Sequence, residues 1–415
     1  MENFLKVLFS KRMLINLFLG FSSGLPLLLT LTALQAWMKD EGVNLKTIGM
    51  VSLIGLPYTL KFLWSPLFDR FVLPVCGLGR RRSWMLVVQI LLGLSIAAMA
   101  FARPKEDPLT VVILAIIVTF FSASQDIVLD AYRREILSDE ELGLGSSIFV
   151  NGYRVAMLLA SSGALILADN LKSWPTVYVI MGFFMLVGII TTLFADEPEI
   201  NAPPPKTLQE AVVGPFLDYF KRDYALWILA FILFYKLGDT LASAMSTPFY
   251  MDIGFTKSQI GYVVKTFGIG SMLLGTFVGG GLILRLGIYR SLWVFGILQM
   301  ISILPFSYLA NAGAVITLLM VMVVIENFCF GMGTAAFVAL MGSMTNRRFT
   351  ATQYALLSSL MGIPRVILSA PMGKVAELSG WSLYFIICAA TAIPGLLILL
   401  KVKNCIASST DDSSV

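Results

Sequence analysis

Long apolar stretches, each about as long as a membrane is thick, recur along the whole chain. A helix rises ~1.5 Å per residue, so roughly 20 apolar residues cross the hydrocarbon core of a bilayer. A backbone in lipid must satisfy its own hydrogen bonds, so each stretch is predicted to be a helix. The pattern therefore predicts an all-α polytopic membrane protein with twelve spans, at about residues 13–38, 47–68, 84–101, 109–132, 146–168, 175–195, 224–250, 258–284, 291–310, 313–343, 350–377 and 382–400.

The composition agrees with a membrane protein. Hydrophobic residues make up 57% of the 415 residues and charged residues only 13%, whereas a soluble domain has about 25% charged residues. The four cysteines are scattered without metal or disulfide spacing, and the chain has no histidine. We therefore expect no bound metal and no cofactor. The net charge of +5 reflects membrane topology, as the loops show, so we expect no nucleic-acid partner.

The loops predict the orientation of the chain. Loops on one side of the predicted membrane hold 18 Lys and Arg residues, and the alternate loops hold 6. Because positive residues mark the cytoplasmic side, both termini are predicted to be cytoplasmic.

The two halves of the chain resemble each other. Residues 37–49 align with 249–261 at an offset of 212, and 152–155 align with 363–366 at an offset of 211. Two six-helix halves in the same orientation imply a pseudo-twofold axis along the membrane normal, with a site near mid-bilayer between them. The predicted division is an N-terminal bundle (1–195), a cytoplasmic linker with an amphipathic helix (196–223), a C-terminal bundle (224–404) and a disordered tail (405–415).

Small residues and proline interrupt two of the predicted helices. Gly20 and Gly24 lie in the first span, where we favour tight helix packing over a binding role. Pro215 lies in the linker helix, which we expect it to break or restart.

Acidic residues inside spans are candidates for proton coupling. Asp126 lies ~10 Å inside Arg133, which should mark the membrane edge, and it shares one helix face with Asp130. A carboxylate at such depth costs about 2.5–3.5 kcal/mol on insertion scales and usually marks an ion or substrate pathway. The alternative is a structural ion pair, which we favour for Asp130, although it stays in the proton-coupling set. Because the chain has no histidine, proton coupling must use a carboxylate, and Glu326 is the second candidate carrier.

Other polar residues at this depth are candidates to bind a substrate. Arg154 and Arg365 hold repeat-equivalent positions, and a guanidinium matches a carboxylate on the cargo or on Asp126. Lys236 and Asp239 could pair with each other or line a cavity. Six basic against four acidic residues inside spans favour an anionic cargo. The candidate substrate-binding residues are Gln125, Lys61, Tyr58, Tyr153, Arg154, Lys236, Asp239, Asn327 and Arg365.

The loop between the second and third spans carries a recognisable motif. It reads Asp69-Arg70 and then Gly77-Leu78-Gly79-Arg80-Arg81-Arg82, and the second half has Leu284-Arg285-Leu286-Gly287 and Arg290. This resembles the aspartate-arginine-glycine-basic loop of the major facilitator superfamily. An insertion stretches the first copy, and the second copy lacks the aspartate. In that family the loop latches the inward side of the two halves, so Asp69, Arg70 and Arg80 are the expected cytoplasmic latch.

At finer grain the sequence resembles the AmpG muropeptide permeases over nearly all of the chain. The matching runs are Ser23-Gly24-Leu25-Pro26-Leu27, Ser124-Gln125-Asp126-Ile127 with Asp130-Ala131-Tyr132-Arg133, and Phe349-Thr350-Ala351-Thr352-Gln353-Tyr354-Ala355-Leu356-Leu357. The resemblance implies a Gram-negative inner-membrane importer. We expect it to be a monomer in contact with membrane lipid. Its cargo would be N-acetylglucosaminyl-1,6-anhydro-N-acetylmuramic acid, with or without peptide. The resemblance also implies coupling to protons, cell-wall recycling and β-lactamase induction.

Other functions stay open at this point. The second run is shared with the acetyl-CoA transporter group, and a drug or solute exporter of the same fold would have the same helix count. An intramembrane aspartyl protease is disfavoured because Ala123-Ser124-Gln125-Asp126 lacks the Gly-x-Gly-Asp context of such sites. Without histidine, serine and zinc chemistry lack a base or ligand, so we expect no catalytic residues.

Overall fold

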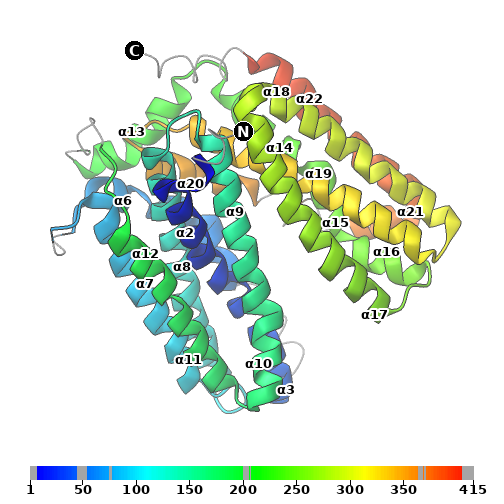
Figure 1. The fold of residues 1–415 in the computed structure, drawn as a ribbon, viewed down its shortest axis with the longest axis horizontal. Coiled ribbons are helices and arrows are strands. Elements are labelled where there is room, and N and C mark those ends of the chain that lie inside the picture. The colour runs from blue at the N-terminus through cyan, green and yellow to red at the C-terminus, as the bar shows by residue number, and fades with distance from the viewer. Residues whose placement is uncertain are drawn as a thin grey trace. The chain divides into compact units, whose positions relative to one another are not determined.

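The chain is helical wherever its structure is described. The computed structural model describes residues 7–43, 54–73, 77–199, 205, 207–362, 368 and 371–403, apart from the side chains of residues 208, 257, 258 and 265, and within these residues it contains no strand (Figure 1). The chain forms two compact units. Unit 1 comprises Met1–Ser138, Ile148–Pro215 and Thr345–Leu356, and unit 2 comprises Asp139–Ser147, Phe216–Met344 and Leu357–Val415.

Unit 1 contains most of the helices of the first half. Helices α2, α7, α8, α11 and α12 pack against one another in it (Figure 1). The bounds are α2 (Lys11–Leu28), η1 (Leu29–Ala33), α3 (Leu34–Asp40), α5 (Leu56–Leu60), η3 (Lys61–Leu63), α6 (Pro66–Arg70), α7 (Arg80–Ala98), η4 (Met99–Phe101), α8 (Pro108–Ile136), α9 (Leu142–Leu158), η5 (Leu159–Gly163), α10 (Ala164–Leu171), α11 (Trp174–Phe184), α12 (Leu186–Phe194) and α13 (Leu208–Phe220).

Unit 2 contains most of the helices of the second half. Helix α18 packs against α19 and α21, and α14 packs against α22. The bounds are α14 (Ala225–Tyr235), α15 (Leu237–Ala244), α16 (Ser246–Asp252), α17 (Lys257–Ile260), η6 (Gly261–Gly268), α18 (Ile269–Ala312), α19 (Ile316–Ser343), α20 (Thr350–Met361), α21 (Met372–Ala390) and α22 (Ile393–Lys401).

The observed helices follow the predicted spans. Among the described residues, nine helices are long and apolar enough to cross a membrane. One of them, Gly261–Ala312, bends at Gly287 (φ 74°) and supplies two of the predicted spans. Helix α21 bends at Gly380 (φ 71°), so its first part completes the eleventh span and the rest begins the twelfth. The first part of the second predicted span (47–53) and part of the eleventh (363–367, 369 and 370) lie outside the described residues.

The predicted break in the linker helix is wrong. Helix α13 continues through Pro215, which lies inside it. Proline removes only one backbone donor, and the Pro215 carbonyl accepts a hydrogen bond from Gln353 Nε2 at 3.1 Å, so the helix is supported at this point.

Glycine lets α2 and α9 approach each other closely. A Cβ on Gly24 would lie 2.1 Å from the carbonyl oxygen of Tyr153, and one on Gly20 would lie 2.1 Å from that of Phe149. These distances are shorter than any van der Waals contact, so side chains here would force the backbones apart. The packing interpretation of these glycines is confirmed.

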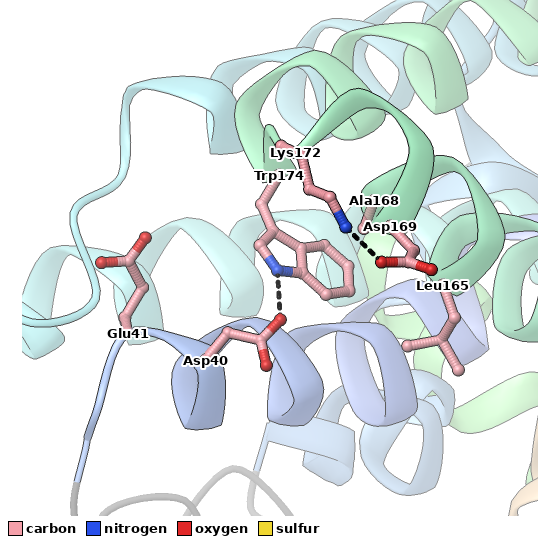
Figure 2. Close-up of a pocket in the computed structure, with 7 residues that line it drawn as sticks. All are labelled: Asp40, Glu41, Leu165, Ala168, Asp169, Lys172 and Trp174. Carbon is pink, nitrogen blue, oxygen red and sulfur yellow. Dashed lines mark hydrogen bonds and ion pairs between the residues drawn. The ribbon is translucent and has the colours of Figure 1, made fainter.

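Side-chain hydrogen bonds join the end of the first span to the start of the sixth. Trp174 Nε1 donates to Asp40 at 2.8 Å (Figure 2). One turn further along α11, the Tyr178 hydroxyl donates to the Leu29 carbonyl at 2.9 Å. A shallow cavity of about 350 Å³ opens beside this contact. The Trp174 ring is only 8% exposed, so it offers no open face for stacking a ligand.

Unit 2 repeats this arrangement. Trp381 Nε1 donates to Asp252 at 3.1 Å, and the Tyr384 hydroxyl donates to the Leu241 carbonyl at 2.6 Å. Asp252 and Leu241 follow their counterparts Asp40 and Leu29 by 212 residues, which is the offset seen in the sequence. The internal repeat is therefore a repeat of hydrogen bonds as well as of helices.

Candidate functional site

Helix α8 carries Asp126 and Asp130, the acidic residues predicted inside the spans of the first half. It begins at Pro108, after Asp107 has capped it by accepting hydrogen bonds from Thr110 N (3.1 Å) and Thr110 Oγ1 (2.5 Å). These two hydrogen bonds hold the pKa of Asp107 below its usual value. The helix then runs without a break to Ile136, which places Asp126 and Asp130 one turn apart on one face.

Asp126 is a half-buried carboxylate with a single hydroxyl donor among the contacts described. Ser23 Oγ on α2 donates to its Oδ1 at 2.5 Å. The charged groups that act on Asp126 are Lys61, Asp130 and Arg133. Asp126 is thus placed at membrane depth with cations nearby but without a close ion pair among its described contacts.

Asp130 differs from Asp126 because cations contact it directly. The Arg133 guanidinium lies 2.9 Å from its carboxylate, and the Lys61 ammonium lies 3.8 Å from it. Lys61 lies on η3 and is only 6% exposed. The structural ion pair that the sequence favoured for Asp130 is present.

Hydroxyl and indole groups complete the polar face of α8. The Tyr58 hydroxyl donates to Ser122 at 2.8 Å, and Trp64 Nε1 donates to Ser124 at 3.1 Å. Gln125 is fully buried and accepts from the Ser22 hydroxyl at 3.3 Å, so it joins α2 to α8. Sequence reasoning missed Ser122, Ser124 and Trp64, because an isolated serine or tryptophan in a span gives no signal of its own.

Helix α9 carries two of the candidate residues, Tyr153 and Arg154. Tyr153 and Arg154 are both partly exposed, and the Arg154 guanidinium approaches the sulfur of Met157 at 3.5 Å. The Tyr153 side chain acts electrostatically on Tyr58. Arg365, the repeat counterpart of Arg154, lies outside the described residues.

A second polar cluster lies in unit 2, where the seventh span is interrupted. Helix α14 ends at Tyr235 and α15 begins at Leu237, with Lys236 between them. The Lys236 ammonium lies 3.5 Å from Asp239 and donates to the carbonyl of Phe330 at 3.3 Å. The local pair that the sequence allowed is therefore formed at a helix discontinuity, which is where transporters commonly place binding groups.

Glu326 lies close enough to this pair to interact with it. Its carboxylate accepts from the Asn327 side chain at 2.7 Å, and both Asp239 and Lys236 act on its charge. Asp239, Glu326, Lys236 and Asn327 are thus brought together, whereas the sequence predicted only the pair of Lys236 with Asp239. Two carboxylates next to one ammonium leave this cluster with an excess negative charge whenever both are ionised.

The structure shows the partners of the predicted latch residues, whose role as a latch stays a prediction. Asp69 pairs with Arg81, whose guanidinium lies 2.9 Å from it and also binds both carboxylate oxygens of Glu135 at 2.5 and 2.8 Å. Arg80 donates to the backbone carbonyl of Asp69 at 3.1 Å and lies 3.6 Å from Glu135. Arg70 points elsewhere, and its guanidinium lies over the Phe71 ring. Among Arg80–Arg82, it is Arg81 whose guanidinium contacts the Asp69 carboxylate.

Asp69 also holds the first turn of α20. Its carboxylate accepts hydrogen bonds from the backbone nitrogens of Ala351 (3.2 Å) and Thr352 (2.9 Å) and from the Thr352 hydroxyl (2.8 Å). A carboxylate at a helix N-terminus satisfies backbone donors and complements the helix dipole. All of these residues belong to unit 1.

Sequence comparison identifies the family. The Major Facilitator Superfamily profile matches residues 13–369. The anhydromuropeptide permease of Escherichia coli K12 is 44% identical over 97% of this chain and 82% of that protein. This chain belongs to the AmpG transporters of the major facilitator superfamily. Another AmpG relative, the putative transporter AmpG 4 of Rickettsia conorii, is 33% identical over 93% of this chain and 95% of that protein.

Solved structures agree on the AmpG chain's fold. The transporter FucP in its outward conformation superposes with a TM-score of 0.71 at 13% identity, covering 94% of this chain and 99% of FucP. The proton:xylose symporter XylE superposes with a TM-score of 0.70 at 12% identity, covering 94% and 95%. The predicted all-α fold of two six-helix halves is confirmed. This AmpG family member is a multi-pass membrane transporter and not an enzyme.

Proposed function

We propose that this chain imports N-acetylglucosaminyl-1,6-anhydro-N-acetylmuramic acid and its peptides from periplasm to cytoplasm, together with protons. The main support is the 44% identity to the E. coli anhydromuropeptide permease along almost the whole chain. The imported sugar would serve cell-wall recycling and the signal that induces β-lactamase. The protein would work as a monomer in the bacterial inner membrane, with both termini in the cytoplasm.

The acidic face of α8 supports proton coupling. Asp126 combines membrane depth, one hydroxyl donor and nearby cations, so it can exist with or without a proton. Asp130, in contrast, is held by Lys61 and Arg133. In our proposal Asp126 takes a proton from the periplasmic side, and Asp130 keeps the cations in place.

Basic residues would hold the anionic groups of the cargo. Lys61 in unit 1 and Lys236 in unit 2 each lie beside carboxylates that a cargo carboxylate could replace. Arg154 and Arg365 would add guanidinium forks. Glu326 would be a second proton carrier, because a proton would remove the excess negative charge of the unit 2 cluster. Alternating access would follow from rocking of the two predicted bundles, 1–195 and 224–404.

The central experiment is uptake of labelled anhydromuropeptide by proteoliposomes, with and without an inward proton gradient. Asp126→Asn should abolish proton-driven accumulation, because the amide cannot carry a proton, while the protein still inserts in the membrane. Asp169→Asn is the matched control. Asp169 lies on α10 with its side chain 82% exposed, so this variant should accumulate cargo as the unmodified protein does.

Each outcome of this experiment has a distinct meaning. Normal accumulation of cargo by Asp126→Asn would show that Asp126 does not carry the coupled proton. If uptake of the sugar is the same with and without the proton gradient, transport is not coupled to protons. Inverted vesicles separate import from the export expected of a drug or solute exporter, and acetyl-CoA as a competing cargo tests the remaining alternative.

A further inference from the structure

Arg133 connects the acidic face of α8 to helix α20. Its guanidinium is only 2% exposed, lies 2.9 Å from the Asp130 carboxylate and donates to the Tyr354 hydroxyl at 2.7 Å. It also lies over the Phe149 and Tyr354 rings, at 4.4 and 5.3 Å from their centroids. A buried guanidinium is strongly destabilised when its carboxylate partner is withdrawn. The position of Arg133 therefore depends on the charge of Asp130.

A continuous line of interactions leads from Asp126 to Tyr354. Lys61 acts on Asp126 and also contacts Asp130, so the two carboxylates share one ammonium. When Asp126 takes a proton, Lys61 is attracted to Asp130 alone and competes there with Arg133. The charged and titratable groups that face Arg133 are Asp130 on α8 and Tyr354 on α20, and those that face Asp130 in turn include Lys61 and Asp126.

Helix α20 contains residues of both compact units. Its first part, up to Leu356, belongs to unit 1, whereas Leu357–Met361 belongs to unit 2. Tyr354 is 3% exposed and lies two residues after Thr352, which Asp69 holds. A change in the hydrogen bond from Arg133 on α8 to Tyr354 therefore acts on a helix that contains residues of both units.

We propose that Arg133 and Tyr354 are positioning residues that transmit the charge state of the Asp126–Asp130 face to the first turns of α20. The inference rests on the proposed function, because it needs a proton to arrive at Asp126. In this role neither residue would contact the cargo. The interaction of Arg133 with Tyr354 on α20 is weaker when Asp126 is protonated and stronger when Asp126 is charged.

Tyr354→Phe tests this role, because it removes the hydroxyl that Arg133 contacts and keeps the ring. In proteoliposomes we expect cargo exchange without a gradient to stay within about twofold of the unmodified protein. Proton-driven accumulation should fall at least about fivefold and lose its dependence on external pH. Tyr178→Phe is the matched control, since it removes an equally buried hydroxyl in the same unit and should leave both assays unchanged.

The two assays separate coupling from folding. A merely structural role for Tyr354 would lower exchange and accumulation together. If Asp126→Asn loses accumulation while Tyr354→Phe behaves like Tyr178→Phe, the inference is wrong and the proposed function stands. If Asp126→Asn accumulates cargo normally, both are wrong.

A second measurement needs no variant at Tyr354. Hydrogen exchange of residues 345–356 in the unmodified protein, corrected for the intrinsic effect of pH, should be at least about fivefold faster at acidic than at neutral pH. The difference should vanish in Asp126→Asn. Equal protection at both pH values would overturn the inference even if Tyr354→Phe failed to reach the membrane.

Discussion

At the scale of single residues, burial decides which of several similar side chains takes a role. Asp69 is followed by Arg70 and, after the insertion, by three consecutive arginines, any of which could pair with it by charge alone. Arg81 is fully buried between Asp69 and Glu135, whereas Arg70 lies against Phe71. Only the folded chain shows which guanidinium is desolvated and therefore depends on its partners.

Arg81→Gln should be much more damaging than Arg70→Gln. Loss of the buried guanidinium leaves Asp69 and Glu135 facing each other, a change that typically costs about 3–5 kcal/mol. Arg70→Gln should change the free energy of unfolding by no more than about 0.5 kcal/mol. Thermal melting of the two purified variants measures the difference, and equal melting temperatures would contradict the pairing described above.

Which charges matter could be read from the sequence, but not how they are paired. Asp126, Asp130, Lys61, Lys236, Asp239 and Glu326 were all predicted from membrane depth alone, because a charge in an apolar span is conspicuous. Their grouping into a unit 1 cluster and a unit 2 cluster depends on which helices pack together. Gln125 illustrates the limit: it lies beside Asp126 in the sequence, but only the folded chain shows that it is fully buried and accepts a hydrogen bond from Ser22.

At the scale of helices, small residues decide how closely two helices cross. Gly20 and Gly24 of α2 face backbone carbonyls of α9, and Gly152 of α9 faces the Leu17 carbonyl of α2 at the same crossing. Unit 2 uses the same device, since a Cβ on Gly275 would lie 2.1 Å from the Phe328 carbonyl. Small residues let membrane helices approach closely, which is where van der Waals packing holds them together.

Gly24→Ala should destabilise the protein because the new methyl group meets the Tyr153 carbonyl at 2.1 Å. Overpacking of this kind costs about 1–3 kcal/mol. Gly270→Ala is the matched control, since nothing lies within 4 Å of its Cβ position, and alanine should stabilise the helix by about 0.5–1 kcal/mol. Thermal melting should therefore move in opposite directions, and a stabilising Gly24→Ala would show that the crossing is looser than described.

At the scale of the whole molecule, three of the helices described contain residues of both compact units. Helix α9 divides between units after Ser147, α13 after Pro215 and α20 after Leu356. The sequence division into two bundles and a linker stays a prediction, but the hydrogen bonds of Trp174 and Trp381 give each half the same internal anchor.

Thiol labelling tests the proposed topology. In a cysteine-free parent, Lys105→Cys lies in the loop before α8 and should react with an impermeant maleimide added to spheroplasts, because that loop is predicted to face the periplasm. Lys221→Cys, directly after α13, should react only after the membrane is opened. Both lysines are exposed, so access to the reagent is the only expected difference. The reverse labelling pattern would invert the orientation, and with it the direction of import.

Local chemistry along the chain was enough to specify the spans, the repeat and the charges inside the membrane, because a bilayer penalises every polar group in a way that shows in the amino-acid pattern. It was not enough to specify partners, since a partner lies on another helix and its choice depends on packing. That is why Arg81, Glu135, Ser122 and Tyr354 emerged only from the folded chain. Their roles come from burial and distance, which no single stretch of sequence contains.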